Sequence, residues 1–279
     1  MVMAKNAKVI TFASTKGGTS KTTTAFNFAV YEALCGRKVL LVDLDYQHDT
    51  TMMFNHVDKK ALRRASIYRG FVHDSKNPQT AFPGDFKPVM VDKRIDLLSG
   101  SSQLDQVDNL MAQRKNLASF VLMHIIYSLK LYRQYDFIIC DCHNSFGTCT
   151  LNGLIVADDI ITPTIPNLFS INAITSMIDK LRSLKRAFYD VKTGQSDINA
   201  KLFFVGSMIK FNTKSSHEFE KAIQNNPKFI AGFKFRELIN KSINNHQSVF
   251  TYAKNNSYNE KVVHDEIIPE FVKMNQAIR

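Results

Sequence analysis

The chain has 279 residues, a formal net charge of +11 and 44% hydrophobic residues, enough apolar material for one large α/β domain or two smaller ones. No apolar segment reaches the length of a membrane span, and the N-terminal residues lack the apolar centre of a secretory signal, so we expect a cytoplasmic protein. Three of the four cysteines, Cys140, Cys142 and Cys149, are spaced poorly for a disulfide framework or a zinc site, which favours reduced thiols. The basic surplus predicts an acidic partner, with nucleic acid ahead of an anionic membrane.

The first predicted strand, residues 8–13, leads into a loop that contains two glycines, two lysines and several hydroxyl groups. An amphipathic helical pattern follows over residues 25–34 and ends at Gly36. In such a strand–loop–helix arrangement, backbone N–H groups of the turn and of the helix N-terminus point at one spot and bind phosphate there. Lys21 can reach the β- and γ-phosphates of a nucleotide, and the Thr22 hydroxyl can ligate Mg²⁺. This segment therefore predicts a nucleotide site.

Apolar, strand-like runs alternate with helical patterns along the rest of the chain. Further strands are predicted at residues 38–43, 94–98, 135–141, 159–163 and 201–206, and helices at residues 117–131, 151–157 and 170–188. We expect residues 58–88 to form an elaborated connection. Near-continuous apolar strands that alternate with helices predict an α/β fold with a mostly parallel sheet and helices on both faces. Ligands of such a sheet bind beyond the carboxyl ends of its strands.

Carboxylates end two of these strands, at the edge of the sheet where the nucleotide loop is expected. Asp43 and Asp45 close one strand, and Asp141 closes another. Nucleotide hydrolysis needs carboxylates there, one to hold the waters of the metal and one to orient the attacking water. Two carboxylates at a strand end are by themselves a weak indication of a nucleotide site. Here they follow the glycine-containing loop and precede Asp141 in the chain, and this order makes the indication strong. His143 is a further candidate base, although packing is the more frequent role of a histidine in a loop.

The loop sequence K-G-G-T-S-K-T-T, residues 16–23, resembles the deviant Walker A loop of the ParA/MinD family of ATPases, K-G-G-x-G-K-[ST]-T. Ser20 stands where the family has glycine, and a β-carbon there is expected to crowd the phosphates or resist a positive φ. The run from Asp43 resembles the family motif D-x-D-P-Q, with Tyr46 in place of proline. The run from Asp141 is similar to D-[CT]-P-P, with His143 and Asn144 in place of the two prolines.

This resemblance implies a P-loop NTPase of the deviant Walker A type, formed by residues 1–279 as a single domain without an N-terminal helix-turn-helix extension. ATP and Mg²⁺ are the implied cofactors. Mg²⁺ would be held by Thr22, Asp43 and Asp141, in part through water. Lys16 would reach across an ATP-dependent homodimer to the phosphates of the partner, and Asp45 would support hydrolysis. The implied ATP-binding residues are Lys16, Gly17, Gly18, Thr19, Ser20, Lys21, Thr22 and Thr23.

The resemblance also implies a function in plasmid, phage or chromosome partition. ATP-bound dimers of such proteins bind duplex DNA without sequence preference, and a ParB-like centromere-binding protein stimulates their slow hydrolysis, so we expect association with the nucleoid. The basic surplus suits a protein that binds the phosphate backbone. A solvated helix face is the alternative for each candidate DNA contact. These candidates are Lys180, Arg182, Lys185, Arg186, Lys210, Lys214, Lys234, Arg236 and Lys241.

Two other functions stay open at this point. Ser20 and the altered loop after Asp141 would suit a nucleotide-gated DNA-binding module with little hydrolysis. A MinD-like membrane-cycling ATPase would need a C-terminal amphipathic helix with a basic face, which the carboxylates of the tail interrupt. We therefore expect core packing for this tail and no stable membrane insertion. Its apolar residues are Ile267, Ile268, Phe271, Val272 and Ile278.

Overall fold

The computed structural model describes residues 7–78, 80–112, 118–167, 170–191, 194–196, 198–224 and 226–278. Within these residues, eight strands form one sheet and two short strands form a separate hairpin. The strands of the sheet are β1 (Lys8–Phe12), β2 (Val39–Leu44), β3 (Val89–Asp92), β4 (Ile95–Leu98), β5 (Phe137–Cys142), β6 (Asp159–Thr164), β9 (Lys201–Ile209) and β10 (Phe229–Lys234). The hairpin consists of β7 (Tyr189–Asp190) and β8 (Gln195–Ser196).

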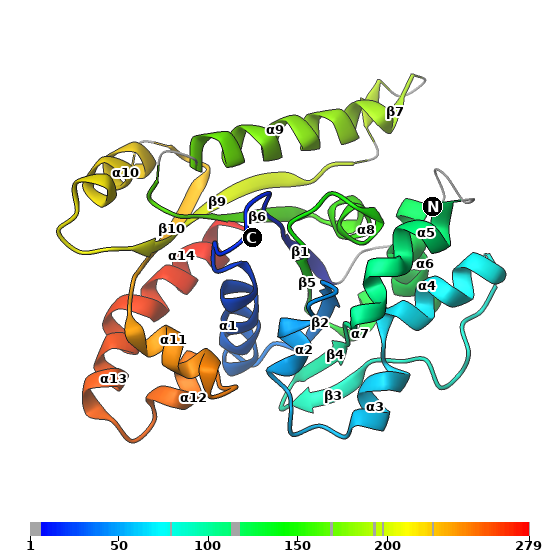
Figure 1. Ribbon diagram of the computed structural model, residues 1–279, viewed down its shortest axis with the longest axis horizontal. Helices are drawn as coiled ribbons and strands as arrows, with labels where there is room; N and C mark the ends of the chain where they lie inside the picture. The colour runs from blue at the N-terminus through cyan, green and yellow to red at the C-terminus, as the bar shows by residue number, and fades with distance from the viewer. Residues whose placement is uncertain are drawn as a thin grey trace.

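The strand order of the sheet is β10-β9-β6-β1-β5-β2-β4-β3, which places β1 in the middle, between β5 and β6 (Figure 1). Neighbouring strands pair in parallel, apart from β3, which pairs antiparallel with β4 at the edge. The predicted mostly parallel sheet is confirmed. Strands β1, β2 and β5 run in one direction, and the candidate site residues follow them in the chain. The loops after these three strands therefore meet at one edge of the sheet.

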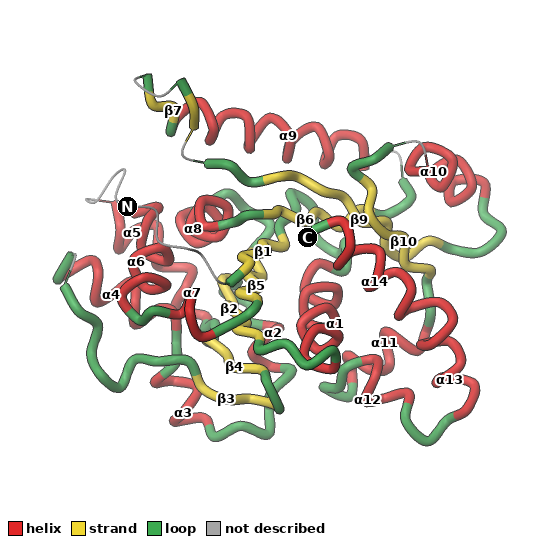
Figure 2. Tube along the Cα trace, turned by 180° about the vertical axis from the view of Figure 1, so that it is seen from behind, coloured by secondary structure: helices red, strands yellow, loops and turns green. Residues whose placement is uncertain are grey.

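Helices cover both faces of the sheet, as the sequence predicts, and the view from behind shows the same two layers (Figure 2). One layer consists of α1 (Lys21–Leu34), α11 (Glu237–Asn244), α12 (Val249–Ala253), α13 (Ser257–Val262), the π-helical turn η3 (Val263–Ile267) and α14 (Ile268–Ala277). The other consists of α4 (Ile67–Lys76), α5 (Val107–Met111), α6 (Val121–Ser128), α7 (Leu131–Gln134), α8 (Thr148–Val156) and α9 (Ser170–Ala187). Shorter or connecting elements are α2 (Asp49–Met52), α3 (Lys59–Arg64), the 3₁₀ turn η1 (Ser102–Gln106) and α10 (Lys214–Gln224).

Side chains of the central strands alternate between two apolar layers. On β2, Leu40 and Val42 pack under the layer of α4 to α9, whereas Val39 and Leu41 pack under α1 and the C-terminal helices. Successive residues of a strand point to opposite faces, so a strand covered on both faces is apolar throughout. This explains why the sequence pattern of β2 is a continuous apolar run.

The C-terminal tail belongs to the layer that contains α1. Phe271 of α14 is only 2% exposed, and its ring centroid lies 6.0 Å from that of Phe28 and 5.5 Å from that of Tyr31, both on α1. Ile267 and Ile278 are buried in the same cluster, and Ile268 and Val272 pack against it. The predicted core packing of the tail is confirmed. Among the described residues, no helix combines the length and the hydropathy that a membrane crossing requires.

Some predicted boundaries are wrong. The helical pattern over residues 117–131 forms two helices, α6 and α7, because Lys130 adopts a φ of +54° and a left-handed residue cannot continue a right-handed helix. Leu117 lies outside the described residues. The helix predicted at residues 151–157 begins earlier, at Thr148. Residues 58–88 contain α3 and α4, and the sequence pattern does not predict the separate C-terminal helices α11 to α14.

Candidate active site

The loop after β1 turns twice through left-handed backbone before α1 begins. Gly18 has a φ of +68° and Ser20 a φ of +64°. Glycine adopts this conformation without cost, whereas a residue with a β-carbon loses roughly 1 kcal/mol in it. The Ser20 carbonyl accepts hydrogen bonds from the backbone N–H and the hydroxyl of Thr24, at 2.8 and 2.7 Å. Position 20 therefore requires the positive φ that favours glycine, and this chain holds a serine there.

The other residues of the predicted ATP-binding set occupy one continuous turn from loop to helix. The Lys16 carbonyl accepts from the hydroxyls of Ser14 and Thr19, at 3.1 and 3.4 Å. Gly17 and Gly18 are exposed, Thr19 is buried, and Thr22 and Thr23 are half-buried in the first turn of α1. The structure thus brings these residues together, while their contacts with a nucleotide stay a prediction.

Lys21 is the first residue of α1. Its ammonium lies between the carboxylate of Asp141 on β5 and that of Asp45, just after β2. Its Nζ donates to Asp141 Oδ1 at 2.8 Å and lies 3.8 Å from Asp45 Oδ2. Burial by itself would lower the pKa of Lys21, but the attraction of Asp141 and Asp45 outweighs it, and the pKa is raised above its ordinary value. Lys21 is therefore a buried cation at neutral pH, in contact with acidic groups.

Asp43 is wholly buried and is tied to the start of α2. Its Oδ2 accepts from the backbone N–H and the hydroxyl of Thr51, at 2.9 and 2.6 Å. A β-carbon on Gly100 would lie 2.7 Å from the Asp43 carboxyl carbon, so only glycine fits there. Burial, and after it the charge of Asp141, raise the pKa of Asp43 to about 7. The predicted role of Asp43 beside Mg²⁺ is untested, and one of its oxygens is already engaged by Thr51.

Asp141 stands opposite Asp43 in the register of β2 and β5. Its Oδ2 accepts from the hydroxyl of Thr50 at 2.8 Å, while its Oδ1 holds Lys21. Asp45, just beyond β2, accepts from the Gln47 backbone N–H at 2.9 Å. One cation and three carboxylates thus gather beside the loop, as the strand-end pattern predicts.

Thr50 and Thr51 are functional candidates that no motif in the sequence predicts. Each hydroxyl donates to a carboxylate of the cluster, Thr50 to Asp141 and Thr51 to Asp43. Thr51 also accepts from the Gly100 backbone N–H at 2.8 Å. The one indication in the sequence is that two hydroxyl residues closely follow the Asp-x-Asp pair.

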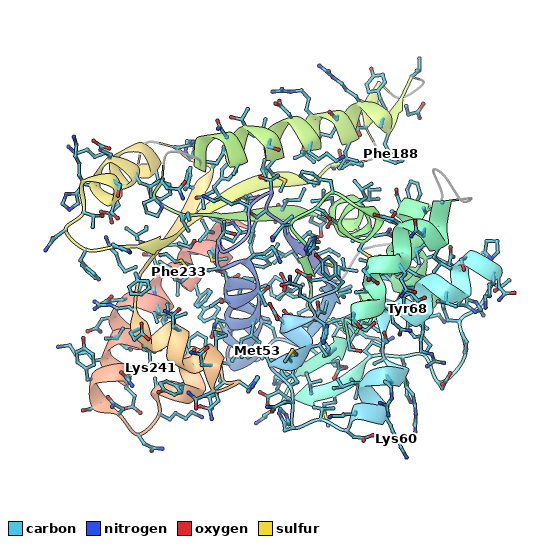
Figure 3. The ribbon with its side chains drawn as sticks, in the orientation of Figure 1. Met53, Lys60, Tyr68, Phe188, Phe233 and Lys241 are labelled. Atoms are coloured by element: carbon cyan, nitrogen blue, oxygen red, sulfur yellow. The ribbon has the colours of Figure 1, made fainter. Side chains whose placement is uncertain are left out.

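A cavity of about 230 Å³ opens beside the loop, between α1, β10 and the C-terminal helices. Its wall is apolar toward Val249, Ile267 and Phe271, and polar at Thr23 and Asn27. Phe233, which lies on β10 toward α14, closes another side (Figure 3). An apolar slot with a few polar groups, next to a phosphate-binding loop, suits a planar base. No motif marks these residues, since they come from α1, β10 and the C-terminal helices and meet only in the folded chain.

Ser207 of β9 links this distant part of the chain to the loop. Its hydroxyl donates to the Thr19 carbonyl at 2.8 Å. The next residue, Met208, has a φ of +52° and lines the cavity. The loop after β1 is therefore fixed from the side of β9 as well.

Two of the predicted DNA contacts, Lys234 and Arg236, line this same cavity. Lys234 forms an ion pair with Glu220, and Arg236 donates to Glu266 through Nε at 2.8 Å. Both cations also stand over the Phe211 ring, at 5.5 and 4.5 Å from its centroid. Their charges are therefore compensated within the chain, next to the cavity rather than on an open face.

A second group of predicted DNA contacts lines an open groove of about 820 Å³. Arg182, Lys185 and Arg186 of the predicted set approach it from the last turns of α9. Two lysines that the sequence did not single out, Lys201 and Lys228, line it from the amino-terminal ends of β9 and β10. Arg182 also pairs with Asp179 at 2.7 Å. The remaining candidates lie elsewhere: Lys180 lies 4.9 Å from the centroid of the Phe146 ring, and Lys210, Lys214 and Lys241 are exposed, Lys241 on α11 (Figure 3).

Comparisons with known proteins agree with this arrangement. A family model described as an AAA domain matches residues 7–192. The chain is 30% identical over 224 residues to the chromosome-partitioning ATPase Soj of Treponema pallidum, which covers 77% of each chain. It is 25% identical over 187 residues to the chromosome partitioning protein ParA of Caulobacter vibrioides, which covers 66% of this chain and 64% of that protein.

Two solved structures share the fold. A Borrelia burgdorferi protein assigned to plasmid partition, bound to AMPPNP, has a TM-score of 0.73 and 23% identity, covering 96% of this chain and 99% of that one. Cobyrinic acid a,c-diamide synthase from Mycobacterium smegmatis, with an ATP analogue and magnesium, has a TM-score of 0.66 and 22% identity, covering 83% and 86%. At this level of identity the likeness shows the fold alone.

Proposed function

The chain belongs to the ParA/MinD family of deviant Walker A ATPases, and we propose that it is a partition-type ATPase, a single domain over residues 1–279. The observation that carries this proposal is the convergence of Lys21, Asp45 and Asp141 beside a loop with left-handed turns. The solved neighbours with an ATP analogue support the choice of ATP. Because the same fold also serves an amide-forming synthase, the proposal depends on these site residues and not on the fold.

The residues present fit Mg²⁺. Thr22 offers a hydroxyl in the first turn of α1, and Asp141 offers a buried carboxylate, which are the oxygen ligands that Mg²⁺ prefers. When bound, Mg²⁺ would neutralise part of the phosphate charge. Asp43 would act beside it, through water.

Each residue of the cluster then has one task. The N–H groups of the loop and of the first turn of α1 bind the phosphates, and Lys21 exchanges its contact with Asp141 for the β- and γ-phosphates. Asp45 orients the attacking water, with its carboxylate held by the Gln47 N–H. The cavity beside Thr23 and Asn27 takes the base.

Lys16 supplies the cation that acts between two subunits. In an ATP-dependent homodimer it reaches the phosphates of the partner, where a second cation stabilises the charge that develops on the transferred group. Its carbonyl is fixed by Ser14 and Thr19, so the turn that carries it is set by local hydrogen bonds.

The groove lined by Arg182, Lys185, Arg186, Lys201 and Lys228, called the basic groove below, is the proposed contact with duplex DNA. The nucleoid is the proposed place of action. Five cations line it, no carboxylate is among the described residues that do so, and it lies at the opposite end of the strands from the nucleotide loop. Such a surface binds the phosphate backbone regardless of sequence. A ParB-like protein bound to a centromere would stimulate hydrolysis and release the DNA.

The direct test is binding of a fluorescent ATP analogue, followed by phosphate release with Mg²⁺. Lys21→Ala should abolish binding, because it removes the cation that faces the phosphates. Lys93→Ala, an exposed lysine in the turn between β3 and β4, removes the same charge elsewhere and should bind as the wild type does. If Lys21→Ala binds as well as Lys93→Ala, the site is wrong.

A nucleotide-gated DNA-binding module with little hydrolysis is the second candidate. It is favoured by one observation, the left-handed Ser20 in a position that suits glycine. Tight binding of the analogue without turnover, unchanged by DNA, would select this candidate over an ATPase. The membrane-cycling alternative is disfavoured, because the apolar side chains of the tail are used in the core.

A further inference from the structure

Two aromatic rings join the loops that follow Asp45 and Asp141. Tyr46 comes directly after Asp45, and His143 is the second residue after Asp141. Their ring centroids lie 4.3 Å apart, with 37° between the ring planes. Tyr46 remains 38% exposed and His143 half-buried, so the pair stands at the border of the site and outside the two apolar layers. A contact of this kind links the loops without contributing much to the core.

Hydrogen bonds within each loop also hold its backbone. The His143 Nδ1 accepts from the Ser145 backbone N–H at 3.2 Å and lies 3.1 Å from the Ser145 hydroxyl. The Tyr46 carbonyl accepts from His48 Nδ1 at 2.9 Å. Local hydrogen bonds therefore shape each loop separately, and the ring contact ties one loop to the other.

The loop of His143 also reaches the phosphate loop. A β-carbon on Gly17 would lie 3.2 Å from Nδ2 of Asn144, so the two loops are in close contact at that point. Asp45, in turn, lies 3.8 Å from Lys21 Nζ, a longer distance than the 2.8 Å between Lys21 and Asp141. The position of Asp45 is thus set by its loop more than by a short ion pair.

We propose that Tyr46 and His143 are positioning residues, whose ring contact holds the Asp45 loop against the Asp141 loop and so fixes Asp45 beside Lys21. This inference rests on the proposed function for the task of Asp45. Residues 46, 143 and 144 are the positions where the resembling motifs carry prolines, which restrict the backbone by fixing φ. In this chain, a contact between side chains supplies the restraint.

Hydrogen exchange on the nucleotide-free protein tests the link between the loops without any ATP chemistry. Tyr46→Ala should speed the exchange of amides in residues 143–147, which are far from Tyr46 in sequence. The matched control is Tyr258→Ala, which removes a 68% exposed tyrosine on α13 and should leave those amides unchanged. Unchanged exchange in residues 143–147 of Tyr46→Ala would overturn the proposal.

Steady-state kinetics test the consequence for Asp45. Tyr46→Ala and His143→Ala should each lower kcat by roughly three- to tenfold, as expected for loss of one aromatic pair, with KM changed less than twofold. The double variant should be no slower than either single one, because both remove the same contact. Additive losses, or a change confined to KM, would contradict the proposal.

Ring-preserving variants separate positioning from proton transfer. His143→Phe and Tyr46→Phe keep a ring and should recover most of the kcat that the alanine variants lose. If His143→Phe is as slow as His143→Ala, the imidazole acts through its proton and the proposal fails. A wild-type protein that binds ATP but does not hydrolyse it would refute the proposed function, whereas the exchange experiment would still decide whether the rings couple the loops.

Discussion

At the scale of single residues, Ser20 departs from the family loop, and its backbone conformation predicts what this departure costs. Its φ of +64° is costly for serine and free of strain for glycine. Ser20→Gly should therefore raise the free energy of unfolding by up to about 1 kcal/mol and leave affinity for an ATP analogue equal or better. Chemical denaturation and a fluorescence titration measure the two effects.

The control for Ser20→Gly is a second serine-to-glycine change that should alter the free energy of unfolding in the opposite direction. Ser183→Gly places glycine on the exposed side of the α9 interior, where it should lower the free energy of unfolding by about 0.5–1 kcal/mol. A Ser20→Gly protein that is less stable, or that binds the analogue several-fold more weakly, would show that the Ser20 side chain makes a necessary contact.

Asp43 gives the site a dependence on pH. Its pKa in the folded protein is about 7, above the value of 3.8 for an unperturbed aspartate. The folded state thus binds its proton more tightly than the unfolded state, so the contribution of Asp43 to stability is full below about pH 4 and is lost as the pH rises through 7. Asp43→Asn should remove this loss and keep the acceptor for Thr51.

Denaturation of wild type and Asp43→Asn without Mg²⁺ or nucleotide, from pH 4.5 to 8, measures this difference. The stability of wild type relative to the variant should fall as the pH rises. A constant difference over that range would mean that Asp43 is already ionised at the low end, with the burial cost offset by its hydrogen bonds.

The sequence was sufficient for the residues whose chemistry follows a motif, and insufficient for those that depend on packing. Lys21, Asp45 and Asp141 could be placed together because parallel strands end at one edge of the sheet. Ser207 and Thr51 could not, because their hydrogen bonds to Thr19 and Asp43 form only once the sheet is packed. The same holds for Lys234 and Arg236, because only the fold brings them to their acidic partners Glu220 and Glu266.

At the scale of elements, the end of α9 and the starts of β9 and β10 form the basic groove. Lys185→Glu and Lys201→Glu should each weaken binding of duplex DNA several-fold, equally for unrelated sequences, and reduce the dependence of affinity on salt by about one counterion per lost phosphate contact. Fluorescence anisotropy at several salt concentrations, with ATP, measures both quantities.

The control for this charge reversal is Lys60→Glu. Lys60 is exposed on α3, away from the groove, and carries the same change in net charge (Figure 3). Equal losses in all three variants would mean that the overall charge and not the groove governs binding.

Elements with strong patterns were predictable, and those with competing patterns were not. The buried strands β2 and β5 and the long helix α9 stand close to where their apolar runs and stripe place them. The break between α6 and α7 depends on a left-handed lysine that no residue preference indicates. The C-terminal helices are short, and their cluster of aromatic rings is visible only once α1 lies beside α14.

At the scale of the whole molecule, the proposal requires two subunits with ATP between them. In that proposal Lys16 would act across the interface, so Lys16→Ala should bind the ATP analogue but remain a monomer and hydrolyse little. Light scattering with and without ATP reports the mass. Formation of a normal dimer by Lys16→Ala would remove Lys16 from the interface.

The central claim is that the cluster around Lys21 hydrolyses ATP with Asp45 orienting the water, and the measurement closest to it is phosphate release by Asp45→Ala. Lys93→Ala serves as the folded reference. We predict that Asp45→Ala binds ATP and dimerises as wild type does, yet releases phosphate at least tenfold more slowly, because misplacing a reacting group costs up to about a hundredfold. Phosphate release at the wild-type rate by Asp45→Ala would contradict the account.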